Sequence, residues 1–318
     1  LIRDASMGIK ILSEMARSPS FKKSEIDKEK IRILAAIKSR EDDPYSYAFK
    51  LLKKNLFIAH PYGMDNLGEA DTIESLTERD LRDFFANVSR PSNCVMTVFG
   101  DFDKEKIIKE VRDNLLSWHS AKACRKPVLS KEEAINSPRI YSEKTEKKQA
   151  IICIGFHAVS IHSPDRYVFE VLNEILNGQG NRLFQEVREQ LGLAYAVGAT
   201  VALGLEPGYL AIYAATAGED KEKVKEIIFN EVRSISENGF SGEEISRAKA
   251  SLVGGWRRNL ETNSSFSLTV SLDSIYVLDF DNYKTYEKCI NSVTGEDLIR
   301  IARQYLNLSN YALVELIP

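Results

Sequence analysis

The sequence has 318 residues and a formal net charge of −3, with 43 % hydrophobic and 28 % charged residues. This is the composition of a soluble globular chain long enough for about two domains. The small net charge argues against a nucleic-acid-binding surface, and the apolar runs are too short for a transmembrane segment.

The first part of the chain predicts mainly helices. Apolar residues recur at helical spacing near the start, and Pro44 separates two later helical stretches. Thr77 followed by Asp80 indicates another helix start. The apolar run bounded by Pro91 and Gly100 predicts one strand. In chain order the expected elements are helices at 2–17, 24–43, 45–57, 77–88 and 103–118, a turn at 60–63, and a strand at 93–99.

An irregular polar stretch at 121–138 breaks this pattern, and we predict a domain linker there. The elements expected after it are strands at 139–142, 150–156, 194–203, 209–215 and 311–317, and helices at 165–177, 181–191, 221–238, 242–261, 265–278 and 295–306. Strands in small groups among long amphipathic helices predict an α+β sandwich with helices on one face of the sheet.

The sequence also repeats itself. Thr77, Asp80 and Leu81 match residues 217 positions later, as do Ser92 and Asn93. Residues 21–30 match the stretch 219 positions later. We therefore predict a duplicated unit of roughly two hundred residues, whose second copy begins near residue 139 and whose first copy lacks about eighty residues at its N-terminus. The predicted domains are the back of a first copy at 1–120, the linker at 121–138 and a complete second copy at 139–318.

The motif Asn177-Gly-Gln-Gly-Asn-Arg-Leu-Phe-Gln-Glu-Val-Arg-Glu-Gln-Leu-Gly-Leu-Ala-Tyr195 resembles the hallmark of the second half of M16 metallopeptidases, the group of pitrilysin, insulinase and the mitochondrial processing peptidase. Residues 60–63, 76–81 and 98–101 resemble further segments of that family, in their usual order. The resemblance covers nearly the whole chain. It implies an α+β fold of duplicated M16-like (LuxS/MPP-like) sandwich domains, in agreement with the repeat.

The resemblance further implies a clamshell-shaped zinc endopeptidase acting on peptides or unfolded proteins. In the family, the first half carries His-x-x-Glu-His and a distant Glu ligand. Two histidines and a carboxylate leave one zinc position open for water, and the motif Glu acts as general base. The second half contributes an Arg and a Tyr, seven residues apart, that reach the substrate main chain.

This sequence departs from the family pattern at the metal site. Its four histidines form no His-x-x-Glu-His motif, and Ala36 stands where the resemblance places the distant Glu ligand. An alanine methyl cannot bind zinc. The chain therefore resembles the metal-lacking Arg/Tyr component of the family: it is expected to hold no metal or other cofactor and to be inactive alone, and zinc is implied for the complete enzyme or its partner.

Arg188 and Tyr195 have the seven-residue spacing of that Arg/Tyr pair and are the predicted catalytic and substrate-binding residues. Gly192 is expected to reverse the chain between them, so that both side chains reach one edge. The Tyr hydroxyl would stabilise a developing oxyanion, and Arg would donate to a substrate carbonyl. The structural alternative is a cation at a helix C-terminus followed by an ordinary strand tyrosine.

Three roles are consistent with these residues. The first is the Arg/Tyr component described above, in a homo- or heterodimer with another M16-like chain and with peptides bound as added strands at a sheet edge. The second is an active zinc endopeptidase truncated at its N-terminus. The third is a structural subunit that has lost catalysis. The compartment stays open between cytoplasm and periplasm.

Overall fold

The structure is a computed structural model that describes residues 4–118, 128–177, 184, 187 and 192–318. Contacts divide the chain into two compact units, each assembled from separate stretches of sequence. Unit 1 takes its described residues from 1–37, 67–128 and 259–283, and unit 2 from 38–66, 129–258 and 284–318. Each unit therefore combines segments from before and after the predicted linker. Because these units are defined by contacts and the predicted domains by duplication, the domain boundaries stay a prediction.

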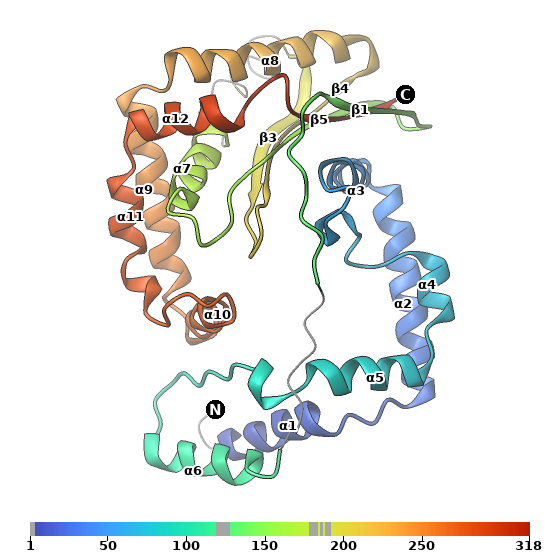
Figure 1. The fold of residues 1–318 in the computed structure, drawn as a ribbon, viewed down its shortest axis with the longest axis vertical. Coiled ribbons are helices and arrows are strands. Elements are labelled where there is room, and N and C mark those ends of the chain that lie inside the picture. The colour runs from blue at the N-terminus through green and yellow to red at the C-terminus, as the bar shows by residue number, and fades with distance from the viewer. Residues whose placement is uncertain (1–3, 119–127, 178–183, 185–186, 188–191) are drawn as a thin grey trace. The chain divides into compact units, whose positions relative to one another are not determined.

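Unit 1 is built from helices (Figure 1). They are α1 (Ala5–Arg17), most of α2 (Lys23–Asp42), α4 (Ala70–Ser75), α5 (Glu78–Val88), the 3-10 helix η3 (Pro91–Asn93), α6 (Lys104–Leu115) and α10 (Asn263–Ile275). Ser89 and Ser6 make side-chain hydrogen bonds to the Ala16 carbonyl and to Glu110, which joins α1 to the end of α5 and to α6.

Unit 2 holds one five-stranded sheet and the helices that cover it. The strands are β1 (Arg139–Lys144), β2 (Gln149–His157), β3 (Ala194–Ala202), β4 (Tyr209–Ala217) and β5 (Ala312–Ile317). The helices are α3 (Pro44–Leu56), α7 (Arg166–Leu176), α8 (Lys221–Asn238), α9 (Gly242–Asn259), α11 (Tyr286–Ser292) and α12 (Gly295–Tyr305), with 3-10 turns η2 (Pro61–Gly63), η5 (Gly218–Asp220) and η6 (Asn282–Lys284) beside them in the sequence.

The sheet has the strand order β1-β5-β2-β4-β3. β1 pairs with β5 in parallel, and the other neighbours are antiparallel. The central strand β2 is buried from Ala150 to Phe156, as expected for a strand covered on both faces. β1 and β3 are the two edge strands. The mixed helix-and-sheet fold predicted from the sequence is confirmed.

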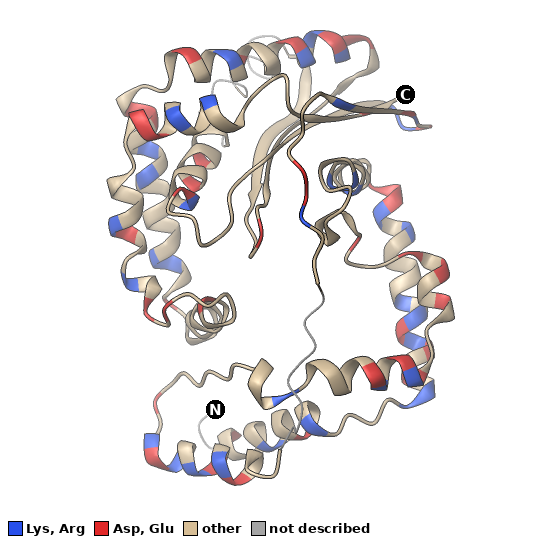
Figure 2. Cartoon of the chain, viewed as in Figure 1, with Lys and Arg blue, Asp and Glu red and all other residues tan. Residues whose placement is uncertain are grey.

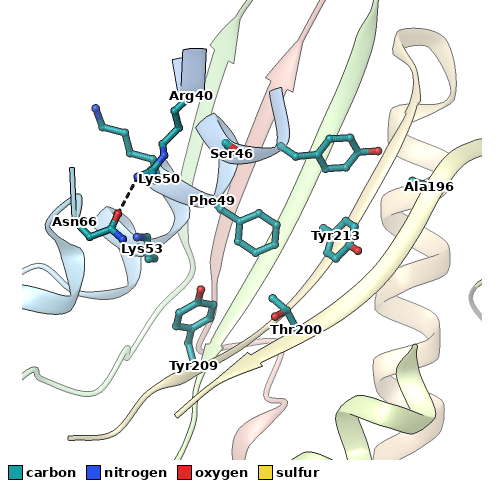
Figure 3. A pocket seen from close by; sticks show the side chains of 11 residues that line it. Arg40, Ser46, Phe49, Lys50, Lys53, Asn66, Ala196, Thr200, Tyr209 and Tyr213 are labelled. Atoms are coloured by element: carbon teal, nitrogen blue, oxygen red, sulfur yellow. Dashed lines mark hydrogen bonds between the residues drawn. The ribbon is translucent and has the colours of Figure 1, made fainter. Parts of the chain in front are cut away.

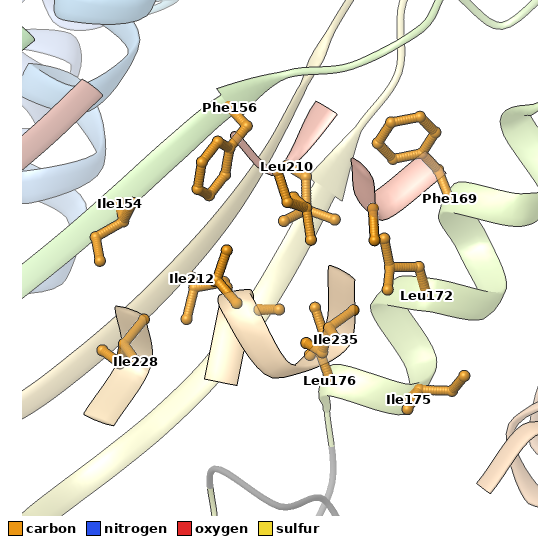
Figure 4. Close-up of a cluster of buried hydrophobic side chains, with 14 of the residues drawn as sticks. Ile154, Phe156, Phe169, Leu172, Ile175, Leu176, Leu210, Ile212, Ile228 and Ile235 are labelled. Carbon is orange, nitrogen blue, oxygen red and sulfur yellow. The ribbon is translucent and has the colours of Figure 1, made fainter. Parts of the chain in front are cut away.

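Helices cover both faces of the sheet, so the expectation of one covered face was wrong. On the first face, Phe169 and Leu172 of α7 and Ile228 of α8 pack against Phe156 and other strand residues (Figure 4). On the second face, α3 buries its apolar side against the strands; that side consists of Ala48, Leu51, Leu52 and Leu56. The amphipathic pattern of α3 was visible in the sequence, but its partner strands β2, β4 and β5 all follow the predicted linker.

Gly155 on β2 allows α3 to approach the sheet closely. A Cβ atom at this position would lie 2.8 Å from Leu56 Cδ1 and 3.1 Å from Leu52 Cδ1. These separations are shorter than ordinary van der Waals contact, so a larger residue would displace the Leu52 and Leu56 side chains from their packed positions. The second face of the sheet therefore depends on α3 as a fitted part of its core.

The helix bounds repeat along the chain with the offsets found in the sequence. α3 and α10 both have 13 residues and lie 219 positions apart, and α2 and α9 begin at Lys23 and Gly242, again 219 apart. α5 and α12 both have 11 residues and lie 217 apart. Their starts carry the same capping box, in which Thr77 N–H donates to Asp80 at 2.8 Å and Thr294 N–H to Asp297 at 3.0 Å.

The strand predicted at 93–99 is not formed: η3 covers its start, and residues 94–99 join no ladder within the described residues. Its counterpart β5 pairs with strands on both sides. Instead, Thr97 Oγ1 lies 2.7 Å and 2.6 Å from the hydroxyls of Ser267 and Ser271 on α10, and Phe99 contacts Phe266 at 4.6 Å between ring centroids. Within unit 1, then, α10 contacts the counterpart of β5, as α3 contacts β5 itself in unit 2.

Charged residues of both signs alternate along α2 and α8, whereas the strands are mostly uncharged (Figure 2). This distribution is consistent with the small net charge of the sequence. Across the described ranges, the helices contain no stretch that is both long and apolar enough to cross a bilayer.

Glu315 is the main exception in the sheet, a carboxylate on β5 that is only 5 % exposed. Lys225 Nζ and Ser142 Oγ each donate to it at 2.9 Å, and Lys221 Nζ lies 3.4 Å away. Burial raises the pKa of the Glu315 carboxyl, but the hydrogen bonds and the lysine charges outweigh burial and hold the pKa below its usual value. These contacts join β5 to β1 through Ser142 and to α8 through the two lysines.

We expect the Glu315 cluster to make folding sensitive to acid. A carboxyl whose pKa is lower in the folded state stabilises it above the unfolded pKa of about 4.3, and this contribution is lost as pH falls through the lower folded value. Glu315→Gln should lower the free energy of unfolding at pH 7 by about 1.5–3 kcal/mol, the contribution of hydrogen bonds to a charged group, and should flatten its pH dependence below pH 5. Urea unfolding at pH 7 and pH 3.5 measures both effects. Glu287→Gln, which breaks the exposed pair with Arg257, is the control; an equal loss there would contradict the argument.

Candidate functional site

Tyr195 lies at an irregularity in the edge strand β3. Ala194 pairs with Thr216 and Ala196 with Ala215. The two consecutive residues of β4 therefore lie opposite three residues of β3. Tyr195 is therefore the extra residue of a β-bulge. A bulge re-aims the side chain of its extra residue, and the Tyr195 side chain is 62 % exposed. The strand thus presents a phenol to solvent at its start.

Gly192 stands at the turn expected before Tyr195, and the helix predicted at 181–191 lies almost entirely outside the described residues. Gly192 has a φ of +62°, a conformation that favours glycine. The Leu193 N–H donates to the Val187 carbonyl at 2.8 Å, and the Thr216 hydroxyl donates to the Leu193 carbonyl. These bonds tie the turn to β4. Arg188, the other predicted site residue, lies outside the described residues.

The free edge of β3 is partly occupied. The Ala199 N–H donates to the Asn177 side-chain oxygen at 3.0 Å, so this N–H points away from β4. In an antiparallel strand the N–H and C=O of one residue point to the same side, and alternate residues share that side. Val197 and Val201 therefore also direct their main-chain groups outward. An added peptide strand finds pairing groups at Val197, next to Tyr195, whereas Asn177 takes the donor at Ala199.

A pocket of about 720 Å³ opens on the sheet face that carries α3, beside the same strand. We call it the basic pocket. Figure 3 shows its cations gathered near Asn66 and its aromatic rings nearer β3 and β4. It is lined by Arg40, Tyr45, Ser46, Phe49, Lys50, Lys53, Asn66, Ala196, Thr200, Tyr209 and Tyr213.

Hydrogen bonds fix the Arg40 side chain of the basic pocket, and burial shifts the pKa values of Lys53 and Tyr209. Arg40 Nη1 donates to Asp65 at 2.5 Å and to Asn66 at 2.9 Å. Burial lowers the pKa of Lys53, an effect that the charge of Asp65 only partly offsets. Burial likewise raises the pKa of the Tyr209 hydroxyl. Sequence reasoning missed this pocket because its residues come from two segments about 130 positions apart, and no local pattern links them.

The histidines near the sheet have structural partners. His60 Nδ1 accepts the Tyr62 N–H at 3.2 Å, which confirms His60 as a turn residue. His157 Nε2 lies 2.8 Å from the Leu56 carbonyl, and its ring stacks on Phe57. His157 is the last residue of β2, and burial lowers its pKa.

The described residues do not fit a zinc site. No group of three or more His, Cys, Asp or Glu side chains among them is arranged to hold a metal ion. Ala36, where the resemblance implies a carboxylate ligand, is an alanine within α2. Near it, Glu29 forms an exposed pair with Arg32 at 2.5 Å on the same helix. No catalytic step of this chain is therefore derived through a metal.

Comparisons with known proteins identify the family of the chain. Residues 75–252 match the family model described as "Peptidase M16 inactive domain". The chain is 28 % identical over 322 residues to "Uncharacterized zinc protease YmxG" of Bacillus subtilis, covering 99 % of this chain and 76 % of that protein. A protease from Helicobacter pylori has the same fold, with a TM-score of 0.93 at 18 % identity over 99 % of this chain and 78 % of that one. A peptidase M16 inactive domain from Pseudomonas fluorescens matches with a TM-score of 0.86 at 22 % identity over 98 % and 74 %. At such identities the two structures establish the fold alone.

Proposed function

This chain belongs to the peptidase M16 family, and from that premise we propose that it is the metal-lacking component of a zinc peptidase. In this role it supplies Arg188 and Tyr195 to a bound peptide. The observation that carries the proposal is the β-bulge that exposes the Tyr195 side chain at the start of an edge strand. A purely structural strand tyrosine has no need of a bulge, whereas a tyrosine that contacts a ligand benefits from being turned outward.

The peptide would pair with the edge of β3 at Val197. Main-chain hydrogen bonds of this kind bind an extended peptide with little regard to its sequence. A strand paired at Val197 carries its carbonyl groups past Tyr195. The phenol hydroxyl would then donate to the carbonyl oxygen as negative charge develops on it, which lowers the barrier to hydrolysis. Arg188 would donate to a neighbouring substrate carbonyl, a role that rests on the seven-residue spacing.

The zinc ion would come from outside residues 1–318. The relative from Bacillus subtilis is named a zinc protease, while Ala36 replaces the carboxylate ligand that the resemblance implies here. We infer that the metal belongs to a second M16-like chain in a dimer with this one. We further propose residues 139–318 as one complete copy of the duplicated unit, with residues 1–120 as part of the other.

The test is to measure zinc content and peptide cleavage together. The preparations are this chain alone and this chain mixed with an M16-like chain of the same source that carries His-x-x-Glu-His. A quenched fluorescent peptide reports cleavage, and elemental analysis reports zinc. We expect the chain alone to contain no stoichiometric zinc and to cleave nothing, and the mixture to cleave.

Two results would contradict the proposal. Stoichiometric zinc and cleavage by the chain alone would show a metal site that the Ala36 argument misses, in favour of a complete peptidase. An inert mixture that nevertheless forms a stable complex would favour a structural subunit. Size-exclusion chromatography of the mixture separates this second result from a simple failure of the two chains to associate.

A further inference from the structure

The basic pocket combines positive charge with apolar walls. Three cations line it, Arg40, Lys50 and Lys53, and no carboxylate is among its lining residues in the described part of the chain. Two of the cations pair with carboxylates that do not line the pocket: Arg40 pairs with Asp65 at 2.5 Å, and Lys50 lies 3.5 Å from Glu41. The Asp65 side chain is only 3 % exposed, whereas Glu41 is half-exposed.

Lys53 is the third cation of the pocket. The negative charge of Asp65 acts on its ammonium, but burial still holds the pKa of Lys53 below its usual value. Its ammonium is half-buried beside the neutral side chains that complete the pocket. A half-buried ammonium gains most from an anion that enters the same space, because the surroundings screen the attraction poorly.

The walls of the pocket suit an apolar side chain. Phe49 and Tyr213 meet edge to face at 5.6 Å between ring centroids, and Tyr45 and Tyr213 at 5.9 Å. Tyr209 continues this surface along β4. The volume of about 720 Å³ is within the range of small-ligand sites and accepts one or two amino-acid residues.

The pocket is also next to the proposed peptide path. Ala196 and Thr200 of β3 line it, so it opens on the α3 face of the edge strand. Because side chains alternate along a strand, every second side chain of a peptide at this edge faces the same side as Ala196 and Thr200. A chain end that follows this edge has direct access to the cations.

We propose that the basic pocket captures the carboxy-terminal residue of a bound peptide, with its carboxylate at Lys53 and its apolar side chain among Phe49, Tyr209 and Tyr213. This inference deepens the proposed function, because the captured end belongs to the peptide at β3. Its consequence is a preference for substrates or products with a free carboxy-terminus near Tyr195. Binding alone tests it, so that its failure is distinct from a failure to find cleavage.

The experiment measures binding of three acetylated tetrapeptides to the full chain by isothermal titration calorimetry. The first is Thr-Val-Ala-Phe with a free carboxylate, and the second is its carboxy-terminal amide. The third is the carboxy-terminal amide of Thr-Glu-Ala-Phe, whose only carboxylate is the glutamate side chain. We expect the free acid to bind at least about tenfold more tightly than either amide, a difference that one well-placed ion pair in a half-buried site supplies.

Matched variants assign that preference to Lys53. Lys53→Met keeps the aliphatic stem and should abolish the difference between acid and amide, whereas Lys53→Arg should keep it. Lys54→Met changes the next residue, which is exposed on the same helix, and should change nothing. Circular dichroism verifies that each variant is folded.

Three results would overturn the inference. Equal binding of acid and amide would remove carboxylate capture. Tighter binding of the Glu-containing amide than of the free acid would assign the pocket to acidic side chains. A preference for the acid that persists in Lys53→Met would place the carboxylate elsewhere.

Discussion

Replacing Tyr195 by phenylalanine is expected to lower peptide hydrolysis about 100-fold or more when this chain is combined with a zinc-bearing M16 partner. Loss of one hydrogen-bond donor to a developing oxyanion typically costs a factor of 10²–10³ in kcat. Because the hydroxyl would act on charge that forms in the transition state, KM should change little. The phenyl ring preserves the packing and the bulge, so the variant isolates the hydroxyl group. Steady-state kinetics with a fluorescent peptide measures both constants.

The matched control for this prediction is Tyr141→Phe. Tyr141 also lies on an edge strand of the sheet, β1, but at the opposite edge, where its hydroxyl donates to Glu143 at 2.7 Å. This variant should hydrolyse peptide at the unmodified rate. If Tyr195→Phe does the same, the exposed phenol has no part in catalysis, and the structural alternative for this residue is favoured.

Truncating Leu52 on α3 is expected to destabilise unit 2 strongly. Its side chain is 0 % exposed and contacts the second face of the sheet near Gly155. Leu52→Ala removes buried methyl groups and leaves a cavity that the rigid sheet cannot fill, which typically costs about 2–5 kcal/mol. Urea unfolding followed by circular dichroism measures the loss.

Leu268→Ala is the corresponding control. Leu268 lies on α10, the counterpart of α3 in the repeat, and is 59 % exposed. Its truncation should change the free energy of unfolding by less than about 0.5 kcal/mol, as is usual for exposed positions. A loss at Leu52 no larger than that at Leu268 would mean that α3 contributes little to the core.

Local sequence signals predicted most elements well. α8 has the predicted bounds, Lys221–Asn238, and β1 begins at the predicted Arg139, directly after Pro138. The Thr-x-x-Asp pattern located the starts of α5 and α12, because a capping box satisfies free N–H groups at a helix start whatever surrounds it. Such signals are short in range and need no knowledge of the tertiary fold.

Errors arose where the outcome depends on distant partners. Residues 93–99 have the composition of a strand, but strand formation requires a neighbour, and the described residues provide none. The single covered face was an error of the same kind, because nothing in residues 44–56 indicates that they pack on β2, β4 and β5, which come much later in the sequence. The contact of His157 with the Leu56 carbonyl of the same helix is equally invisible in the local sequence.

The candidate site shows the same difference between what local patterns predict and what depends on distant partners. Tyr195 was identified by its resemblance to a family motif, and Gly192 by its place between a helix and a strand. The bulge at Tyr195 and the amide of Asn177 on Ala199 follow from the register of β3 on β4, which no local pattern encodes. Arg188 lies outside the described residues and stays a prediction.

The position of α3 has a consequence for how such a chain can be divided. This helix precedes the predicted linker, yet it supplies one wall of the core around a sheet that follows the linker. A gene split at residues 121–138 would yield a C-terminal product whose sheet exposes Ile151, Ala211 and Val314 to water. The C-terminal product would therefore lack one wall of its core, so the segments before and after the predicted linker depend on each other for folding.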